Sequence, residues 1–368
     1  MAKPNEIPFV SLTRQFQALE VELTQVFLDV GRSGVYILGE SVDQFEQAIA
    51  EYCGAKFAIS VANGSDALFL CLKAMGVGPG DEVITAANSF IASTWVIVAT
   101  GAKPVLVDVC SDLNIDPLEV EKAISSKTKV IIPVHLAGRS AAMDDINAIS
   151  EKAGLYVLED AAQAIGARYH GKPIGSLGSA AGFSLHPLKN LGVYGDGGFI
   201  TTSDEILANK LRLLRNHGLR TRNDCEIWGY NSRLDSIQAA FALVKLKHLD
   251  TWNERCRQIA KYYRESLVDY VDVPKDQKWE QNVYHNFVIT TSLRDELQIY
   301  LREAGIGSAI HYPIPIHLQP AAKDLGYKVG SFPKAEELAC TMLSLPIYPE
   351  LLDSEVERVV TKVKEFYV

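Results

Sequence analysis

The sequence predicts an α/β protein with a mostly parallel, seven-stranded sheet between helices and a smaller α+β domain after it. Between about residues 57 and 202, short apolar runs rich in β-branched residues alternate with helix-like stretches. These runs are too apolar to face water, which is typical of a parallel sheet that helices cover on both sides. After Gly218 long helix-like segments replace the alternation. We therefore expect a large domain over residues 1–250 and a small domain over 251–368.

Each expected strand of the sheet is a short apolar run. In chain order the runs read FAISVAN, EVITAAN, KPVLVDV, TKVIIPVH, LYVLEDAAQ, GFSLH and GGFITT. The motifs described below fall mainly at the ends of these runs. Open α/β sheets bind their ligands at the carboxyl ends of their strands, so these motifs are candidates for a shared site.

The segments outside the sheet are mostly helix-like. The first 50 residues predict a helix, a glycine-rich turn and a second helix. The stretch LDSIQAAFALVKLKHLDTWNERCRQIAKYYRESL has the apolar spacing of one long helix or two joined ones. In the small domain YHNFVITT and IGSAIHYP are strand candidates, and DELQIYLREAG and SEVERVVTKVKEFYV are helix candidates.

Composition and charge argue against several classes of function. The chain has 368 residues and a formal net charge of −9, which disfavours non-specific binding to nucleic acid or to anionic membranes. Its six cysteines include no CxxC pair, so we expect reduced thiols, no metal site and a cytoplasmic protein. The first 16 residues have no continuous apolar core of a signal peptide. The longest uncharged run, 83–102, contains several polar residues and fits a strand, loop and helix better than a membrane span.

The stretch VANGSDALFLCLKAMG, residues 61–76, is a candidate phosphate cradle. A strand ends, Asn63 and Gly64 make a turn, and Ser65 and Asp66 open an amphipathic helix. The free N–H groups and the positive dipole end of that helix would face one point, which favours an anion. The alternative is that Ser65 or Asp66 only caps the helix.

Two further motifs supply a carboxylate and an amine. Asp160 ends the run LYVLED, so its carboxylate is expected at the edge of the sheet, partly desolvated and in need of a cationic partner. Lys189 lies in FSLHPLKNLGVYGDGG between a strand-like run and a glycine-rich loop, where burial would lower its pKa and make it nucleophilic. Taken singly, Asp160 could be a helix cap or a metal ligand, and Lys189 a solvated surface residue.

Taken together, the cradle, the carboxylate and the lysine indicate one cofactor. A phosphorylated pyridine aldehyde needs an anion site, an acidic partner for its ring nitrogen and a lysine for its aldehyde. The three features occur here in that order. The sequence therefore predicts binding of pyridoxal 5'-phosphate.

With these motifs, the sequence resembles the DegT/DnrJ/EryC/StrS family of fold-type-I, pyridoxal-phosphate-dependent aminotransferases that act on nucleotide-linked keto-sugars. The resemblance runs over nearly the whole chain. It rests on SGVYILG, NGSDAL, GDEVIT, LEDAAQA, FSLHPLKNLG with GDGG, RNHG, GYNSRLDSIQAA and HYPIPIHLQPA.

The resemblance implies roles for particular residues. Lys189 matches the lysine that binds the cofactor and moves a proton between cofactor and substrate carbons, and Asp160 matches the partner of the pyridinium nitrogen. Phe90 matches the aromatic residue that stacks on the ring, and Gln163 the residue on its other side. The positions that match the phosphate site are Gly64, Ser65, Asp66 and Ser184, together with Asn231, which the family presents from a neighbouring subunit. A homodimer with shared active sites is implied.

Substrate residues are expected outside the cofactor motifs. Arg220 lies in the basic stretch RNHGLRTR, suited to a nucleotide diphosphate or a donor carboxylate, although a solvated charged loop is the alternative. His311, Tyr312 and His317 of IHYPIPIHLQ could form a polar wall of a sugar pocket, or be core or surface residues. Tyr36 and His186 complete the predicted substrate set.

The implied reaction is transamination in two halves. L-Glutamate would leave as 2-oxoglutarate and convert the cofactor to pyridoxamine 5'-phosphate, which would then aminate the keto-sugar of a dTDP- or UDP-sugar. Dehydratase-type relatives carry histidine at the position of Lys189, so lysine favours an aminotransferase. HYPIPIHLQPA resembles members that act on 3-keto sugars; 4-keto sugars stay an alternative, as does a cofactor-binding regulator without turnover. A Rossmann oxidoreductase predicts a GxGxxG turn after an early strand, which this sequence lacks there.

Overall fold

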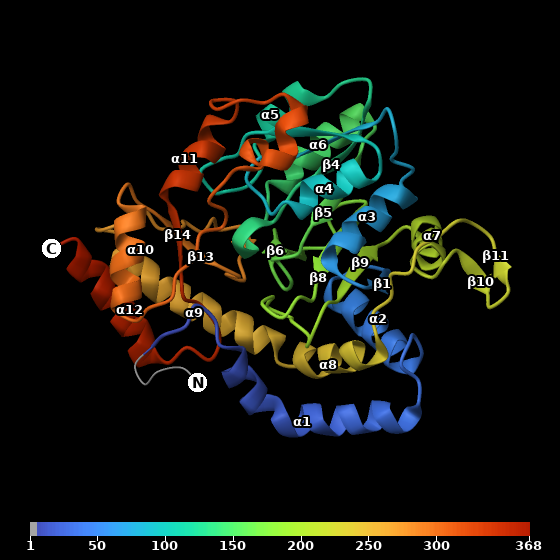
Figure 1. The fold of residues 1–368 in the computed structure, drawn as a ribbon, viewed down its shortest axis with the longest axis horizontal. Coiled ribbons are helices and arrows are strands. Elements are labelled where there is room, and N and C mark those ends of the chain that lie inside the picture. Colours follow the sequence, from blue (N-terminus) through green and yellow to red (C-terminus); the bar gives the residue numbers. More distant parts are fainter. Residues whose placement is uncertain (1–5) are drawn as a thin grey trace.

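The computed structural model describes residues 6–368; the expectations for residues 1–5 lie outside that range. A seven-stranded sheet runs through the centre of the molecule in the order β1-β9-β8-β5-β4-β2-β3 (Figure 1). β9 runs antiparallel to both of its neighbours, and the other pairs are parallel. All seven expected strands are confirmed: β1 (Phe57–Val61), β2 (Glu82–Ala86), β3 (Lys103–Val107), β4 (Thr128–Ile132), β5 (Tyr156–Asp160), β8 (Ala180–Ser184) and β9 (Gly198–Thr202).

Helices cover both faces of the sheet, because successive side chains of each strand point to opposite faces and both sets are apolar. One face carries Ile59, Val83 and Leu158 and packs against α3, α4 and α7. The other carries Ala58, Ile84 and Val157 and packs against α2, α5, α6 and α8. These helices are α2 (Glu40–Tyr52), α3 (Gly64–Ala74), α4 (Ala92–Ala99), α5 (Pro117–Ala123), α6 (Met143–Ala153), α7 (Glu205–Arg215) and α8 (Ser236–Leu246).

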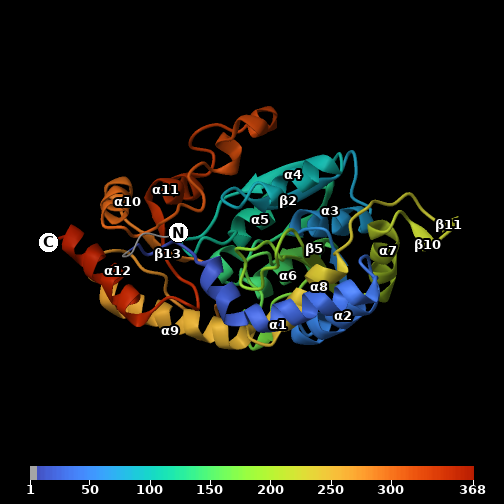
Figure 2. The same cartoon turned by 60° about the horizontal axis from the view of Figure 1, so that its bottom comes forward.

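A second group of elements lies beside the sheet, at the end of the molecule where the C-terminus is drawn (Figures 1 and 2). It has an apolar core of its own, built from α9, α10, α12 and a two-stranded sheet, β13 and β14. Ile7 from the start of the described chain joins this core and bridges to Ile306. The bounds are α9 (Leu249–Leu267), β13 (Phe287–Thr290), α10 (Arg294–Glu303), β14 (Met342–Leu345) and α12 (Asp353–Phe366).

One expected strand of this part is wrong. The segment IGSAIHYP forms no strand; Ile306 and Ala309 make single bridges to two different segments, one at Ile7 and one at Ser344. The Ile7 nitrogen donates to the Gly305 carbonyl and the Gly307 nitrogen to the Ile7 carbonyl, whereas the Ala309 nitrogen donates to the Ser344 carbonyl, so the segment changes partner after one bridge. The partner of β13 is instead β14, in the run MLSL, which the sequence did not mark as a strand.

The remaining elements are short or peripheral. α1 (Leu12–Ser33) runs along α8, and the stretch 234–267, expected as one long helix or two joined ones, forms two helices, α8 and α9. The hairpin of β10 (Leu219–Thr221) and β11 (Asp224–Cys225) projects from the body of the molecule (Figure 1). The others are η1 (Leu136–Gly138), β6 (Arg168–Tyr169), β7 (Lys172–Pro173), β12 (Glu280–Gln281), η2 (Ile316–Leu318), η3 (Pro320–Leu325) and α11 (Pro333–Thr341). Within residues 6–368 no helix combines the length and apolar character that a membrane crossing needs.

Candidate active site

A cavity of about 470 Å³ lies at the carboxyl edge of the sheet, where the ends of β5 and β8 meet the start of α3. Its volume is in the range of cofactor and small-molecule sites. Several residues from distant parts of the sequence line it: Gly64, Ser65, Phe90, Ser93, Asp160, Gln163, Ser184, His186, Lys189, His285, His311 and Tyr312. The cavity thus brings the three predicted cofactor motifs together.

The start of α3 leaves unpaired donors at the cavity. Asn63 caps the helix, because its side-chain oxygen accepts a hydrogen bond from the Asp66 nitrogen at 2.8 Å. The interpretation of Ser65 or Asp66 as the cap is therefore wrong. Within residues 6–368, the N–H groups of Gly64 and Ser65 have no hydrogen-bond acceptor. Such free donors at the positive end of a helix dipole favour an anion.

Glycine lets this helix start approach the neighbouring strand. A Cβ on Gly64 would lie 2.7 Å from the Cβ of Ser184, the last residue of β8. That distance is shorter than side chains tolerate, so only glycine allows the free N–H groups of α3 and the Ser184 hydroxyl to meet at one corner of the cavity. The geometry fits a phosphate group.

Asp160 is the buried carboxylate of the site. It ends β5 and is 6% exposed. One carboxylate oxygen accepts from the Ser93 hydroxyl at 2.7 Å and the other from the Ala162 nitrogen at 3.2 Å. Burial raises its pKa, while these hydrogen bonds and the charge of Lys189 act in the opposite direction. A cationic ring nitrogen in the cavity would add the counter-charge that a buried carboxylate requires.

Lys189 enters the same cavity from the loop after β8. Its backbone nitrogen donates to the His186 carbonyl at 2.8 Å, which forms a tight turn. Burial lowers the pKa of its side chain to about 8, and the Asp160 carboxylate partly offsets that fall. A lysine with this pKa has a substantial neutral fraction near pH 8, and the neutral amine is the nucleophilic form.

Two side chains could hold a planar ring between them. Phe90 is 53% exposed and its ring centre lies 5.7 Å from that of Tyr312. Gln163 is buried; its amide oxygen accepts from the Ala137 nitrogen at 2.7 Å, and its amide nitrogen donates to the Tyr312 hydroxyl at 3.3 Å. Both of its polar ends are therefore fixed, which gives the cavity a preformed wall.

Three histidines, His186, His285 and His311, line the cavity together with Lys189. His186 is exposed, whereas His285 and His311 are partly buried. Burial, together with the charge of Lys189, lowers the pKa of His311 to about 4 and that of His285 well below its ordinary value. The last two rings are therefore neutral at pH 7. They can donate or accept hydrogen bonds without adding charge beside the lysine.

Five predicted site residues lie outside the cavity of a single chain. The Asp66 carboxylate accepts from the Ser232 hydroxyl at 2.6 Å, and Asn231 is exposed beside that serine. Tyr36 is also exposed, and Arg220 pairs with Glu226 on the projecting hairpin. His317 is buried and faces Glu336 at 2.9 Å. The roles assigned to these five residues remain predictions.

Sequence reasoning did not single out Ser93 or His285. Ser93 follows Phe90 by one helical turn in NSFIAS, and a hydroxyl placed there on a helix over the sheet edge could have suggested a donor to Asp160. His285 lies in the loop after β12, where the Val283 nitrogen donates to the Gly138 carbonyl at 3.0 Å and the Asn286 nitrogen to the Ala137 carbonyl at 3.4 Å. No local pattern marks it.

Comparison with known proteins identifies a family of aminotransferases. Residues 17–364 match the DegT/DnrJ/EryC1/StrS aminotransferase family. A pleiotropic regulatory protein of Geobacillus stearothermophilus is 48% identical, with 98% of each chain covered. A dTDP-3-amino-3,6-dideoxy-alpha-D-galactopyranose transaminase of Aneurinibacillus thermoaerophilus is 47% identical, over 98% of this chain and 99% of the relative.

Solved structures agree with these sequence relatives. DesV of S. venezuelae, in complex with a ketimine intermediate, has a TM-score of 0.97 and 43% identity, with 99% of each chain covered. NtdA of Bacillus subtilis, with bound cofactor PMP, has a TM-score of 0.92 and 32% identity, over 99% of this chain and 85% of that one. The chain therefore belongs to the DegT/DnrJ/EryC1/StrS aminotransferase family, whose cofactor, pyridoxal 5'-phosphate, fits the anion site, carboxylate and lysine of this cavity.

Proposed function

We propose that this protein transfers the amino group of L-glutamate to a keto-sugar linked to a nucleoside diphosphate, at carbon 3 of the sugar. It acts as a cytoplasmic homodimer. The observation that carries the proposal is the cavity in which Lys189, with its lowered pKa, faces buried Asp160 beside the free N–H groups of α3. Membership of the aminotransferase family supports the same reaction class.

The cofactor would be held at its two ends. Its phosphate would accept hydrogen bonds from the N–H groups at the start of α3 and from the Ser65 and Ser184 hydroxyls, with Asp66 tying the helix start to Ser232. Its ring would lie between Phe90 and Gln163. Because the ring nitrogen would lie beside Asp160, both charged ends of the cofactor meet a complementary group of the chain.

The chemistry divides between cofactor and protein. Pyridoxal 5'-phosphate supplies an aldehyde that takes up the donor's amino group and a ring that accepts the electron pair released at the substrate carbon. Asp160 keeps the proton on the ring nitrogen, which makes the ring a better electron acceptor. Lys189 Nζ, once free of the cofactor, removes the proton from the carbon of glutamate and later returns a proton to the sugar carbon.

The sugar would lie on the open side of the cavity. His186, His311 and Tyr312 supply polar atoms there, and the low pKa of His311 keeps that ring neutral at pH 7. Tyr36 and Arg220, which are exposed and lie outside the cavity, are assigned to the nucleotide or the outer part of the substrate, whereas buried His317 is paired with Glu336. The name of the Aneurinibacillus relative, a 3-amino-sugar transaminase, supports carbon 3 over carbon 4.

Exposed apolar side chains support a dimer. Tyr36 and Ile37 are 57% and 45% exposed, and Trp228 is 94% exposed. The two segments belong to one region, because Ile37 bridges to Asp235 just after the Trp228 segment. Large exposed aromatic and apolar residues are typical of interaction surfaces. Asn231 lies in the same region and is available to the cavity of a second copy.

A cofactor-binding regulator is the second candidate, because the Geobacillus relative is named a pleiotropic regulatory protein. The two functions differ in how the bound cofactor responds to an amino donor. A regulator without turnover keeps the visible absorption of its cofactor when L-glutamate is added. An aminotransferase loses it.

We predict that L-glutamate bleaches the visible band of the wild-type holoenzyme and that 2-oxoglutarate restores it. Lys189→Ala removes the proton carrier, so turnover falls by at least about 10²-fold, the lower range for a lost acid–base group. Lys152→Ala, which changes an exposed lysine on α6, is the control and keeps wild-type turnover. Multiple turnovers by the Lys189→Ala protein, or a wild-type band that no amino donor changes, would contradict the mechanism.

The keto position is tested with a panel of dTDP- and UDP-linked 3-keto and 4-keto sugars. We expect kcat/KM to be highest for a 3-keto substrate. The measurement is single-turnover amination by the pyridoxamine form of the protein, followed by mass spectrometry of the product. Activity confined to 4-keto sugars would refute the assignment to carbon 3 and leave the reaction class intact.

A shared active site predicts complementation between two inactive variants. Mixed dimers of Lys189→Ala and Asn231→Ala chains contain one site with both native residues if Asn231 acts across the interface. Activity should then rise on mixing after subunit exchange, compared with each variant alone. If Asn231 acts within its own chain, every site in the mixture lacks one residue and no activity returns.

A further inference from the structure

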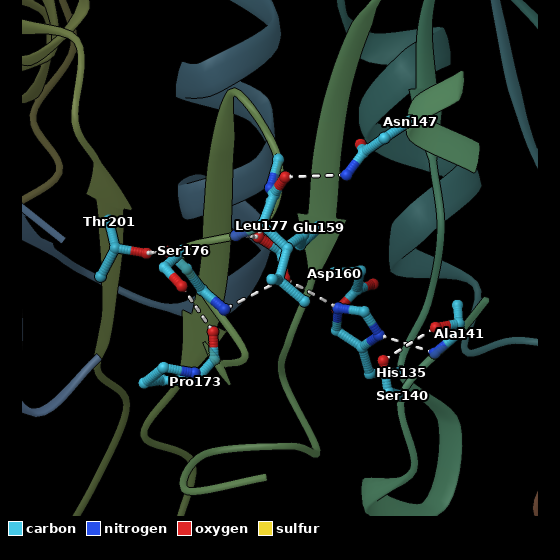
Figure 3. A network of polar contacts seen from close by, with 12 residues as sticks. His135, Ser140, Ala141, Asn147, Glu159, Asp160, Pro173, Ser176, Leu177 and Thr201 are labelled. Carbon is cyan, nitrogen blue, oxygen red and sulfur yellow. Dashed lines mark hydrogen bonds and ion pairs between the residues drawn. The ribbon is translucent and has the colours of Figure 1, made fainter. Parts of the chain in front are cut away.

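A cluster of hydrogen-bonded polar groups lies next to Asp160, around the neighbouring residue Glu159 (Figure 3). Its centre is Glu159, the residue before Asp160 on β5, whose side chain points to the opposite face of the sheet. Glu159 and His135 are both fully buried, and the His135 Nε2 atom lies 3.0 Å from a Glu159 oxygen. The transamination chemistry uses neither residue, so their burial calls for another explanation.

Every acceptor of Glu159 is in use. One carboxylate oxygen accepts from the Leu177 and Gly178 nitrogens at 2.9 and 2.8 Å. The other accepts from the Gly175 nitrogen at 3.0 Å and from His135. A Cβ on Gly178 would lie 2.7 Å from the Val157 carbonyl oxygen, so glycine is needed for the loop to come this close. The loop and strand are built around the carboxylate.

The partners of His135 also fix its protonation. Its Nδ1 accepts from the Ala141 nitrogen at 3.1 Å, so that ring nitrogen carries no proton. The proton therefore sits on Nε2 and is donated to Glu159. With both ring nitrogens engaged, His135 ties three segments together: its own chain after β4, the Ala141 backbone, and β5.

The backbone around His135 holds Asp160 and Gln163, two of the residues that would contact the cofactor ring. The His135 nitrogen donates to the Asp160 carbonyl at 3.0 Å, and the Asp160 nitrogen donates to the Pro133 carbonyl at 2.9 Å. Two residues further on, the Ala137 nitrogen donates to the Gln163 side chain at 2.7 Å. The segment 133–141 thus contacts Asp160 through one N–H group and Gln163 through another.

We propose that His135 and Glu159 are positioning residues that fix the segment 133–141 and, through it, the placement of Asp160 and Gln163 against the cofactor ring. The inference rests on the proposed roles of those two residues. Stability alone is a weak reason for the pair, because replacing both partners of a buried hydrogen bond by apolar groups of the same shape can leave the stability of a core nearly unchanged. Precise placement is a stronger reason, since a displacement of about 1 Å at reacting groups can cost about 10²-fold in rate.

The test compares two replacements of His135 in the holoenzyme. His135→Leu fills the space but leaves Glu159 short of one donor and the Ala141 N–H without an acceptor. His135→Gln can still donate to Glu159. Thr201→Val is the matched control, because the Thr201 hydroxyl donates to the Gly175 carbonyl at 2.7 Å on the same loop and makes no contact with segment 133–141.

The readouts are the pH midpoint and circular dichroism of the visible cofactor band, with kcat and KM for L-glutamate. For His135→Leu we expect the pH midpoint to move in the same direction as in Asp160→Asn, weaker visible dichroism, and a fall in kcat of about 10- to 100-fold. KM should stay within about twofold. His135→Gln should recover most of the wild-type midpoint, and Thr201→Val should keep it.

Two results would overturn the proposal. In the first, His135→Leu lowers the unfolding temperature, but its pH midpoint and dichroism equal those of Thr201→Val. His135 and Glu159 would then only stabilise the fold. In the second, His135→Gln and His135→Leu change the band equally. If His135→Leu does not fold, Glu159→Gln is measured against the same criteria. If Asp160→Asn itself leaves the pH midpoint unchanged, the proposed role of Asp160 has failed, which is distinguishable from failure of the positioning proposal.

Discussion

The active site depends on two opposite charges held in a cavity that disfavours both. Burial disfavours the charged forms of both groups, so it raises the pKa of Asp160 and lowers the pKa of Lys189. The charge of each group partly offsets the shift of the other. Hydrogen bonds from Ser93 and Ala162 favour the charged carboxylate of Asp160, and the lowered pKa of Lys189 favours loss of its proton.

Several elements of the fold place the groups of this site. Asp160 is at the end of a central strand, with Ser93 of α4 donating to its side chain and the segment just after β4, at Pro133 and His135, holding its backbone. The start of α3 brings free N–H groups to the same edge, because glycine at position 64 lets the helix touch β8. Rigid elements rather than mobile loops therefore carry the carboxylate and the anion site, which keeps their geometry fixed when substrate enters.

The sheet and the cofactor motifs could be predicted from the sequence. The residues that contact these motifs through tertiary packing could not. Apolar runs determine strands locally, so all seven strands of the large sheet were found. Contacts made through tertiary packing were missed: the loop of His285 is held by the distant residues Ala137 and Gly138, and IGSAIHYP makes single bridges to Ile7 and Ser344 instead of a continuous ladder. Glu159 and His135 did leave a signal. An acidic residue inside a buried strand needs donors, and a histidine ends the neighbouring run TKVIIPVH.

We propose that Asp160 keeps a proton on the ring nitrogen of the cofactor. The most direct measurement is the ¹⁵N NMR chemical shift of ring-labelled pyridoxal 5'-phosphate bound to the wild-type protein and to Asp160→Asn. We expect a protonated ring nitrogen in the wild type across the pH range of activity, and a neutral one in the variant. A neutral ring nitrogen in the wild-type holoenzyme, or the same shift in both proteins, would contradict it.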